Sequence, residues 1–443
     1  SDGSPNYAHS MHKVNILPSA ADILNAEEEN DEKEMNIELE AIALQRMLIL
    51  NGNKDSVPGY IIEDASINST TAVDDIGNKI SPRTKYLDAC LRDGINPKPS
   101  VVIRRGLTKT LDLSHHGLGD KMGEILAGCI LELPYLQCIS VADNNLTDDS
   151  LGPIVKALVE MKNLLQVDLS NNVVGDVASN TLSDFLGSTG CPIEKLVMRN
   201  ADVDDFECER FISALKENDS TNLREIDLSQ NLLGSAEQLN VVMPELTTAG
   251  EAFAELLETE TCKVKKLELG WNMIRGDSAV AFAQALKVNT SVTYLDLSYN
   301  SFGKDGGREL GRALMYNSTL THLNVSSNGL EGTSTFCICV GLVENKAMRK
   351  LILDGNPIGN LGAKAVMQVP IMIGSRCKIS VKGCNIAIPA TIYPADGEPF
   401  DFDNILRTYN LNMEDCYQRA QSFMVLNLVA CHHTITIANW EQN

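Results

Sequence analysis

The sequence predicts an α/β solenoid, in which short strands stack into one parallel sheet and helices cover its convex side. Three observations support this fold class. An eleven-residue pattern, with apolar residues at its positions 1, 4, 6 and 11 and mostly Asn at position 9, recurs along the middle of the chain. Most copies are 28 residues apart, and each continues into a stretch with apolar residues at helical spacing.

The repeats share one register over ten copies. The clearest copies are LLQVDLSNNVV at 164–174, VTYLDLSYNSF at 292–302, LTHLNVSSNGL at 320–330 and MRKLILDGNPI at 348–358. The second apolar position of each copy falls at Leu111, Ile139, Val167, Leu196, Ile226, Leu267, Leu295, Leu323, Leu351 and Ile379. Successive intervals are 28, 28, 29, 30, 41, 28, 28, 28 and 28 residues, a regularity that chance does not produce.

Each part of the repeat has a physical reason. Alternating apolar residues such as Leu295 and Leu297 point inward from one short strand, so the residues between them face the opposite side. The Asn after the strand is expected to bond backbone groups of adjacent turns. This Asn ladder consists of Asn144, Asn172, Asn231, Asn272, Asn300, Asn328 and Asn356, and it is interrupted by His116, Ala201 and Cys384.

The helical part of each repeat forces the stack to curve. Ala279, Phe282, Ala283 and Leu286 form one apolar helix face, and Leu310, Ala313 and Leu314 form another. Because a helix is wider than the ~4.8 Å spacing of strands, the helices must lie outside and the sheet inside the curve. The expected result is a horseshoe with a concave parallel sheet.

A strand and a full helix in about 28 residues is the long variety of leucine-rich repeat. The pattern over residues 107–390 resembles the ribonuclease-inhibitor-like family, which includes NOD-like receptors, Ran GTPase-activating proteins and several ciliary and flagellar proteins. The resemblance implies a leucine-rich-repeat solenoid of about ten repeats, and it is specific for fold rather than for function. A short segment, TKYLDACLRDGINP at 84–97, is similar to the leader helix of ciliary and testis-type members.

Regions outside the repeats differ in composition. Residues 1–76 carry 15 acidic and 4 basic side chains, which predicts a mostly disordered arm with one short helix around 37–48. Residues 77–106 form an N-terminal capping helix region, in which Ser81-Pro82 begins a helix that ends at Gly94. Residues 391–443 are expected to be a C-terminal capping or extension segment. Because the chain begins at Ser1, the sequence leaves open whether it is a fragment of a longer protein.

The 41-residue interval contains about 13 extra residues, SAEQLNVVMPELT at 235–247, which are apolar in the middle. Two interpretations remain open. The favoured one is that this insertion packs on its own rim of the sheet; the other is that it is a docking element near Trp271.

Composition excludes several classes of function. A net charge of −22 disfavours nucleic-acid binding, because phosphate contacts need clustered Lys and Arg, and it suits partners with a basic surface. Nowhere is there a run of about 18 apolar residues, so no membrane span is expected. The twelve cysteines are mostly scattered singly, which favours a reducing compartment. We therefore expect a cytoplasmic protein, with a cilium or the cytoskeleton as the alternative setting that the resemblance implies.

Motifs of catalysis are missing from the sequence. It has no G-x-x-x-x-G-K-[ST] phosphate loop, no G-x-S-x-G elbow and no H-E-x-x-H. The pairs His115-His116 and His432-His433 lack Cys or carboxylate partners at zinc spacing. The sequence thus predicts a protein that is not an enzyme and that needs no metal or cofactor.

The candidate partner-binding residues face the concave side. Asp112, Asp168, Asp227, Glu268 and Asp296 form an acidic column, although L-D-L-S is near-consensus for this repeat and the column is as readily inherited as selected. Repeats six to eight add an aromatic patch of Trp271, Tyr294, Tyr299 and His322 beside Glu268 and Asp296. Exposed aromatics next to carboxylates are typical of a binding hot spot that accepts Lys or Arg.

These observations favour a non-enzymatic scaffold that binds a protein partner across the concave face, with its oligomeric state left open. The first alternative is a GTPase-activating protein of the Ran type, which the resemblance allows although the acidic tail of that group is not at this C-terminus. The second is a fragment of an immune-type sensor, which no nucleotide-binding module in the chain supports.

Overall fold

The computed structural model describes residues 82–101 and 108–385. The chain divides into two compact units, Ser1–Arg104 and Arg105–Asn443. The predicted acidic arm with its helix (1–76) and the predicted C-terminal segment (391–443) lie outside the described residues.

In the first unit, helix α2 (Pro82–Arg92) begins at the proline that the sequence placed there. Proline suits the first turn because the N–H that it lacks has no helical partner at that position. Tyr86 is fully buried, and its hydroxyl accepts a hydrogen bond from the backbone N–H of Lys98 at 2.9 Å. The chain leaves the helix at Gly94, which has a φ of +69° that glycine adopts without strain. A short 3-10 helix, η1 (Pro99–Val101), follows.

The second unit contains one sheet of ten parallel strands, which lie in the order of the chain. The residues that the sequence aligns as repeat origins are the central residues of these strands. They pair in register from Leu111 with Ile139 through to Leu351 with Ile379, so the predicted solenoid is confirmed. The strands are β1 (Thr110–Asp112), β2 (Cys138–Ser140), β3 (Gln166–Asp168), β4 (Lys195–Val197), β5 (Glu225–Asp227), β6 (Lys266–Glu268), β7 (Tyr294–Asp296), β8 (His322–Asn324), β9 (Lys350–Ile352) and β10 (Lys378–Ser380).

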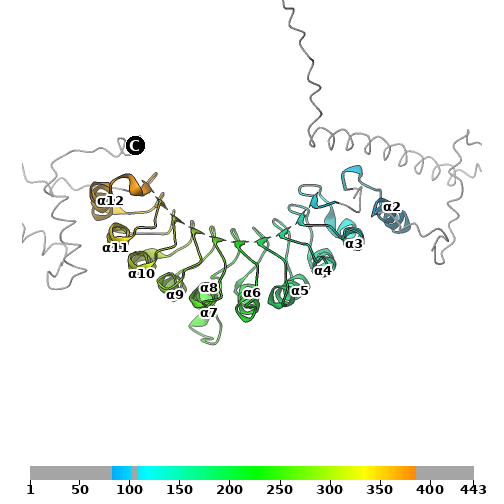
Figure 1. Cartoon of the computed structure of the whole chain (residues 1–443), viewed down its shortest axis with the longest axis horizontal. Coiled ribbons are helices and arrows are strands. Elements are labelled where there is room, and N and C mark those ends of the chain that lie inside the picture. Colours follow the sequence, from blue (N-terminus) through cyan, green and yellow to red (C-terminus); the bar gives the residue numbers. More distant parts are fainter. Residues whose placement is uncertain (1–81, 102–107, 386–443) are drawn as a thin grey trace, which may run out of the picture. The chain divides into compact units, whose positions relative to one another are not determined.

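Helices of this unit form one layer on the outer, convex side of the sheet (Figure 1). A strand is followed by a helix in every repeat from the first to the ninth, and β5 is followed by two. The helices are α3 (Gly119–Ile130), α4 (Asp148–Val159), α5 (Asp176–Gly187), α6 (Asp205–Glu217), α7 (Glu237–Asn240), α8 (Ala249–Glu258), α9 (Gly276–Ala285), α10 (Gly303–Tyr316), α11 (Gly332–Glu344) and α12 (Gly359–Ile373), with the 3-10 helix η2 (Gly374–Arg376) after the last.

The core lies between the sheet and the helices and runs continuously along the array. Phenylalanines connect consecutive repeats: the Phe253 and Phe282 rings meet edge to face with centroids 6.3 Å apart, and Phe282 and Phe302 do so at 6.2 Å. All three side chains are at most 2% exposed. Because each repeat buries its apolar residues against its neighbours, stability depends on the stack and not on any single repeat.

The Asn ladder connects each repeat to the one before it. Asn300 Nδ2 donates to the carbonyl of Leu297 in its own repeat at 3.0 Å and to that of Leu269 in the preceding repeat at 2.8 Å. Its Oδ1 accepts from the backbone N–H of Ile274 at 3.0 Å. The same double donation occurs at Asn144, Asn172, Asn231, Asn272, Asn328 and Asn356. These bonds satisfy carbonyls where the chain turns away from the sheet.

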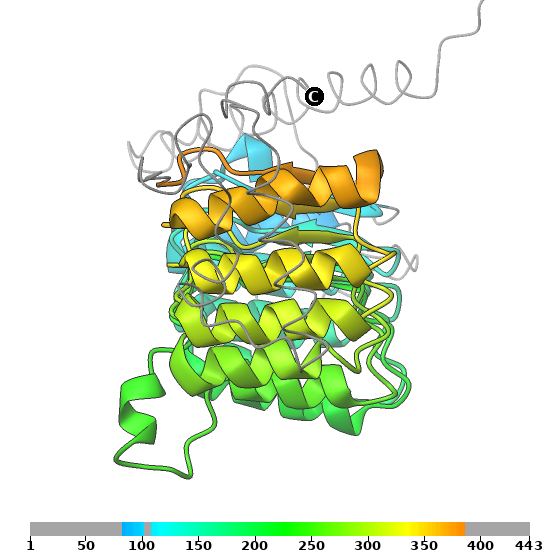
Figure 2. The same ribbon diagram turned by 90° about the vertical axis from the view of Figure 1, so that its left-hand side faces the viewer.

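The insertion leaves the array instead of lying on the sheet. Figures 1 and 2 show α7 and the residues after it standing out beyond α8, away from the strands. Val241 and Val242 are 88% and 77% exposed, and Leu239 and Met243 are nearly half-exposed. The favoured interpretation, that the insertion packs on its own rim, is therefore wrong for these four side chains.

Candidate protein-binding surface

The concave face presents two rows of side chains, because the middle residue of each strand from β1 to β9 is buried and its two neighbours are not. The first row, from the first residue of each strand, contains Thr110, Cys138, Gln166, Lys195, Glu225, Lys266, Tyr294, His322, Lys350 and Lys378. The second row, from the third residue, contains Asp112, Ser140, Asp168, Val197, Asp227, Glu268, Asp296, Asn324, Ile352 and Ser380. The lysines of the first row were not part of the predicted site.

Only the central part of the predicted acidic column is continuous. Asp227, Glu268 and Asp296 follow one another on consecutive strands. Asp168 does not join them, because Val197 of β4 lies between it and Asp227. The structure thus corrects the column of the sequence prediction to three adjacent carboxylates in repeats five to seven.

The aspartates of the second row have a local structural role. Oδ1 of Asp227 accepts a hydrogen bond from the N–H of Ser229 at 2.9 Å, and Oδ1 of Asp296 accepts one from Ser298 at 2.8 Å. Asp112 and Asp168 bond the serine two residues on in the same way. Each carboxylate stabilises the turn that follows its strand. This geometry favours inheritance of L-D-L-S from the repeat over selection for a partner.

Lys266 offsets part of the central acidic charge. Its Nζ lies 3.0 Å from Glu268 Oε2 and 5.3 Å from the centre of the Tyr294 ring. Partial burial is the largest single effect and lowers the pKa of Lys266, but the hydrogen bond to Glu268 together with the charges of Glu268 and Glu225 holds the pKa above its usual value. Glu268 is therefore engaged within the sheet.

The four predicted aromatic and histidine side chains form two separate pairs. Tyr294 and His322 are neighbours in the first row, with ring centroids 6.0 Å apart and ring planes at 27°. Burial raises the pKa of Tyr294, and the charges of Asp296 and Glu268 add to the effect. This first pair is half-buried on the sheet.

The second pair lies beyond the strands, on the loops at their C-terminal ends. The rings of Trp271 and Tyr299 stack with centroids 3.8 Å apart and planes at 12°. Trp271 is 52% exposed and Tyr299 is 44% exposed. Two large stacked rings, each about half exposed, form a flat apolar platform at the rim of repeats six and seven.

Both residues of this platform have a left-handed backbone, with φ of +59° at Trp271 and +54° at Tyr299. Every repeat uses this conformation at the residue before the ladder position. The other occupants are His115, Asp143, Asn171, Asn200, Gln230, Ser327, Gly355 and Gly383. Gly, Asn and Asp tolerate it well, whereas a bulky side chain there is uncommon and costs of order 1 kcal/mol or more. A repeated turn of the fold therefore carries two residues that are poorly suited to it.

Sequence comparisons agree with this architecture. The family described as "Leucine Rich repeat" matches residues 288–311, 316–339 and 344–367, in the same half of the array as the platform. The ribonuclease inhibitor of Sus scrofa is 26% identical over 248 residues, which are 52% of this chain and 54% of that protein. This chain is a leucine-rich-repeat solenoid that is similar to ribonuclease inhibitors.

Other relatives of the leucine-rich-repeat chain are larger. The NACHT, LRR and PYD domains-containing protein 14 of Mus musculus is 25% identical over 181 residues, which are 40% of this chain and 17% of that protein. Protein 5 of the same series, also from Mus musculus, is 26% identical over 236 residues, or 48% of this chain and 20% of its own length. The chain thus spans about half of the ribonuclease inhibitor and about a fifth of the NACHT proteins.

Elsewhere in the repeats, the described residues offer little for chemistry. They contain no group of three or more His, Cys, Asp or Glu side chains arranged to hold a metal ion. None of their helices combines the length and apolar character that crossing a bilayer requires. Burial raises the pKa of the Cys191, Cys208 and Cys377 thiols, which keeps them in the unreactive protonated form.

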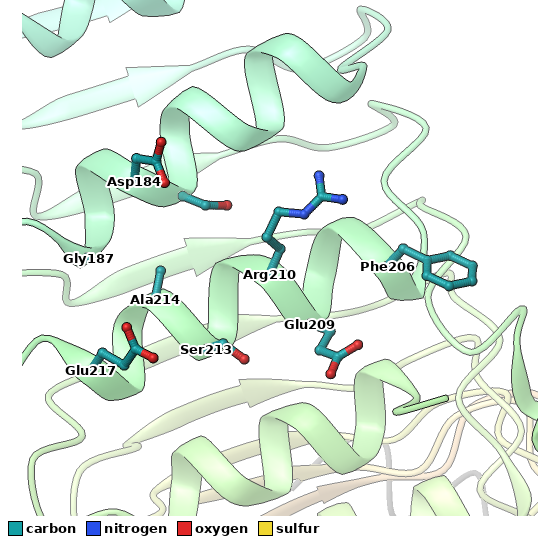
Figure 3. A pocket seen from close by; sticks show the side chains of 9 residues that line it. Asp184, Gly187, Phe206, Glu209, Arg210, Ser213, Ala214 and Glu217 are labelled. Carbon is teal, nitrogen blue, oxygen red and sulfur yellow. The ribbon is translucent and has the colours of Figure 1, made fainter. Parts of the chain in front are cut away.

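A groove of about 570 Å³ lies on the convex side between α5 and α6. Figure 3 shows its polar side chains, including Asp184, Glu209 and Arg210, spread along the two helices instead of converging on one point. Arg210 is already engaged, since one guanidinium N–H donates to Ser179 Oγ at 3.1 Å. The groove therefore does not resemble a catalytic pocket.

Two features of the surface escaped the sequence prediction. The left-handed row has a visible signal: Asp143, Asn171 and Asn200 stand at equivalent positions where Gly355 also occurs, and all of these residue types favour positive φ. The Lys266–Glu268 pair had none, because both residues lie on β6 and neither is unusual for a strand surface. Only the register places Lys266 beside Tyr294.

Proposed function

We propose that this protein is a non-enzymatic interaction scaffold, and that it binds a protein partner at the Trp271–Tyr299 platform and the adjoining concave face of repeats six to eight. The family supports the coarse statement, since the name of the ribonuclease inhibitor records action on another protein. The fold supports it as well, because a stacked array leaves a long open surface on the sheet.

The observation that carries the proposal is the left-handed backbone under the two stacked aromatic rings. Folding alone would be served better by Asn or Gly at both positions, as it is at Asn171 and Gly355. Strained residues that persist in a fold are enriched at binding sites, and Trp and Tyr are the residues most enriched in interface hot spots. Backbone strain and residue type therefore both indicate Trp271 and Tyr299.

The chemistry of the platform indicates what it contacts. The open faces of the rings suit an aliphatic side chain or the guanidinium of an arginine, which stacks on aromatic surfaces. Asp227 and Asp296 lie nearby in the second row and supply negative charge. The Lys266–Glu268 pair limits that charge, so we expect a partner with one or two cationic side chains and not a broadly basic surface.

Quantitative affinity capture tests the proposal. The intact chain is compared with a Trp271→Asn, Tyr299→Asn double variant, and the matched control is Tyr316→Asn, since Tyr316 is a 67% exposed aromatic on α10 outside the platform. We expect the double variant to lose the partner by about thirtyfold in apparent affinity, as is usual for hot-spot aromatics, and the control to keep it. Equal recovery by all three proteins would contradict the proposal.

The cytoplasmic or ciliary setting stays a prediction from the sequence, and so does the alternative of a Ran-type GTPase-activating protein. A single-turnover GTP hydrolysis assay with Ran separates that alternative from the scaffold. We expect no change in the hydrolysis rate on addition of the chain, and clear stimulation would overturn the scaffold proposal.

A further inference from the structure

The insertion of the fifth repeat is fixed at its base by a buried carboxylate. Asp205, the first residue of α6, is 1% exposed. Its Oδ1 accepts hydrogen bonds from the N–H groups of Gly234 at 2.8 Å and Ala249 at 2.6 Å, and its Oδ2 accepts one from Ala236 at 2.6 Å. One side chain thus joins the backbone at the start of the insertion to the backbone just after its end. Charge-assisted bonds of this kind are strong, so the base is rigid.

The insertion also supports the next helix. Burial raises the pKa of Glu237 in α7, and the backbone N–H groups of Ser278 and Asp277, in the first turn of α9, act against that rise. A carboxylate at that position stabilises the helix through its unpaired N–H groups and its dipole. Gly276 leaves the room required, since a Cβ there would come within 2.6 Å of Glu237 Oε1. The base of the insertion is therefore a structural part of the array, although its tip leaves it.

The tip of this anchored segment is apolar and open. The tip residues Leu239, Val241, Val242 and Met243 are all at least 44% exposed, and Val241 reaches 88%. In Figures 1 and 2 this segment projects beyond the helical layer. A rigid base with an exposed apolar tip is the arrangement expected of a docking element. A segment that is already positioned loses little conformational entropy on binding.

A groove beside the tip carries negative charge. It has a volume of about 390 Å³ and is lined by Pro244, Leu246 and the α8 residues Glu251, Glu255 and Glu258, among others. Glu258 is exposed, and Glu255 keeps 57% of its side chain exposed although it pairs with Lys216. Apolar side chains therefore border a row of glutamates that follows one helix face.

We propose that the insertion and α8 form a second docking site, for a basic amphipathic segment of a partner protein, on the convex side and separate from the platform. The apolar face of such a segment packs on Val241 and Val242, and its lysines or arginines lie along Glu255 and Glu258. Charge complementarity selects this occupant. A second copy of this chain, with its net charge of −22, and its own 1–76 segment, with 15 acidic and 4 basic side chains, would both be repelled.

A defined peptide tests the site directly in the full-length chain. The probe is a fluorescein-labelled helix of Leu and Lys about 14 residues long, roughly four turns, which has one apolar and one basic face. Two control peptides are a scrambled sequence of the same composition and a Leu–Glu version. Fluorescence anisotropy gives the affinities. We expect the Leu–Lys helix to bind more tightly than either control, and equal binding of the Leu–Glu helix would overturn the proposal.

Variants locate the binding. Val241→Ser with Val242→Ser changes two highly exposed side chains, so the fold is preserved, and we expect it to weaken the Leu–Lys helix by about tenfold. The matched control is Val288→Ser, because Val288 is also a highly exposed valine, at 61%. This control should have no effect on the affinity. A photoreactive leucine in the peptide should cross-link to residues 239–258. Cross-links confined to residues 1–76, or an unchanged affinity of the double variant, would show non-specific charge attraction and contradict the site.

Discussion

The rim of the sheet shows the same backbone turn used in two ways. In repeats two to five, the left-handed position holds Asp143, Asn171, Asn200 and Gln230, with φ between +49° and +60°. In repeats six and seven it holds Trp271 and Tyr299 at nearly the same φ. The turn therefore imposes a conformation without fixing the side chain. Where the fold does not require a particular side chain, an unfavourable residue indicates a demand from outside the fold.

The ladder Asn, which follows the left-handed residue in the chain, is the opposite case. There the fold requires one particular side chain. We expect Asn300→Ala to lower the free energy of unfolding by about 3 kcal/mol, since it removes one of the two side-chain donors to the carbonyls of Leu269 and Leu297 and the acceptor of the Ile274 N–H. Urea unfolding followed by circular dichroism measures the loss. Asn171→Gly is the control, because Asn171 is exposed and glycine suits its φ of +54°. Equal losses in both variants would remove the distinction between ladder and rim.

Backbone strain at Tyr299 predicts that two substitutions of this residue differ in stability. Tyr299→Asn gives up the stacking on Trp271 but introduces a residue that tolerates positive φ, whereas Tyr299→Ala gives up the stacking and keeps the strain. We expect the Ala variant to be less stable than the Asn variant by about 1 kcal/mol. The same comparison at Tyr316, which has helical backbone in α10, should instead favour Ala. Identical stabilities at position 299 would mean that its backbone is not held in the left-handed region.

A pH titration distinguishes the half-buried pair on the sheet from the platform. Burial raises the pKa of Tyr294 above its ordinary value of 10.0, so the unfolded chain ionises there first. The free energy of unfolding is thus unaffected by this group below pH 10.0 and falls as the pH rises through the raised pKa. Tyr294→Phe should remove a phase of the tyrosinate absorbance titration that lies above pH 10.0. Loss of an early phase instead would contradict the burial of this ring.

The fold could be predicted from the sequence more completely than the binding site. The ten strands, their register and the Asn positions follow from the 28-residue period, because stacked repeats must present the same residue types at the same places. The exposed insertion was misjudged, since apolar residues such as Val241 indicate burial unless the structure shows that nothing covers them. The platform was named from its residue types, but its stacking and its left-handed backbone depend on how neighbouring repeats align.

Site-specific photo-cross-linking tests most directly whether the aromatic rim binds the partner, because it compares an aromatic and a non-aromatic position of the rim in one experiment. A photoreactive phenylalanine derivative is placed at position 299 in one protein and at position 171 in another; both positions share the left-handed turn and an exposed side chain. We predict a cross-linked protein partner from position 299 and none from position 171. The same partner from both positions, or from position 171 alone, would contradict the assignment of binding to the aromatic rim.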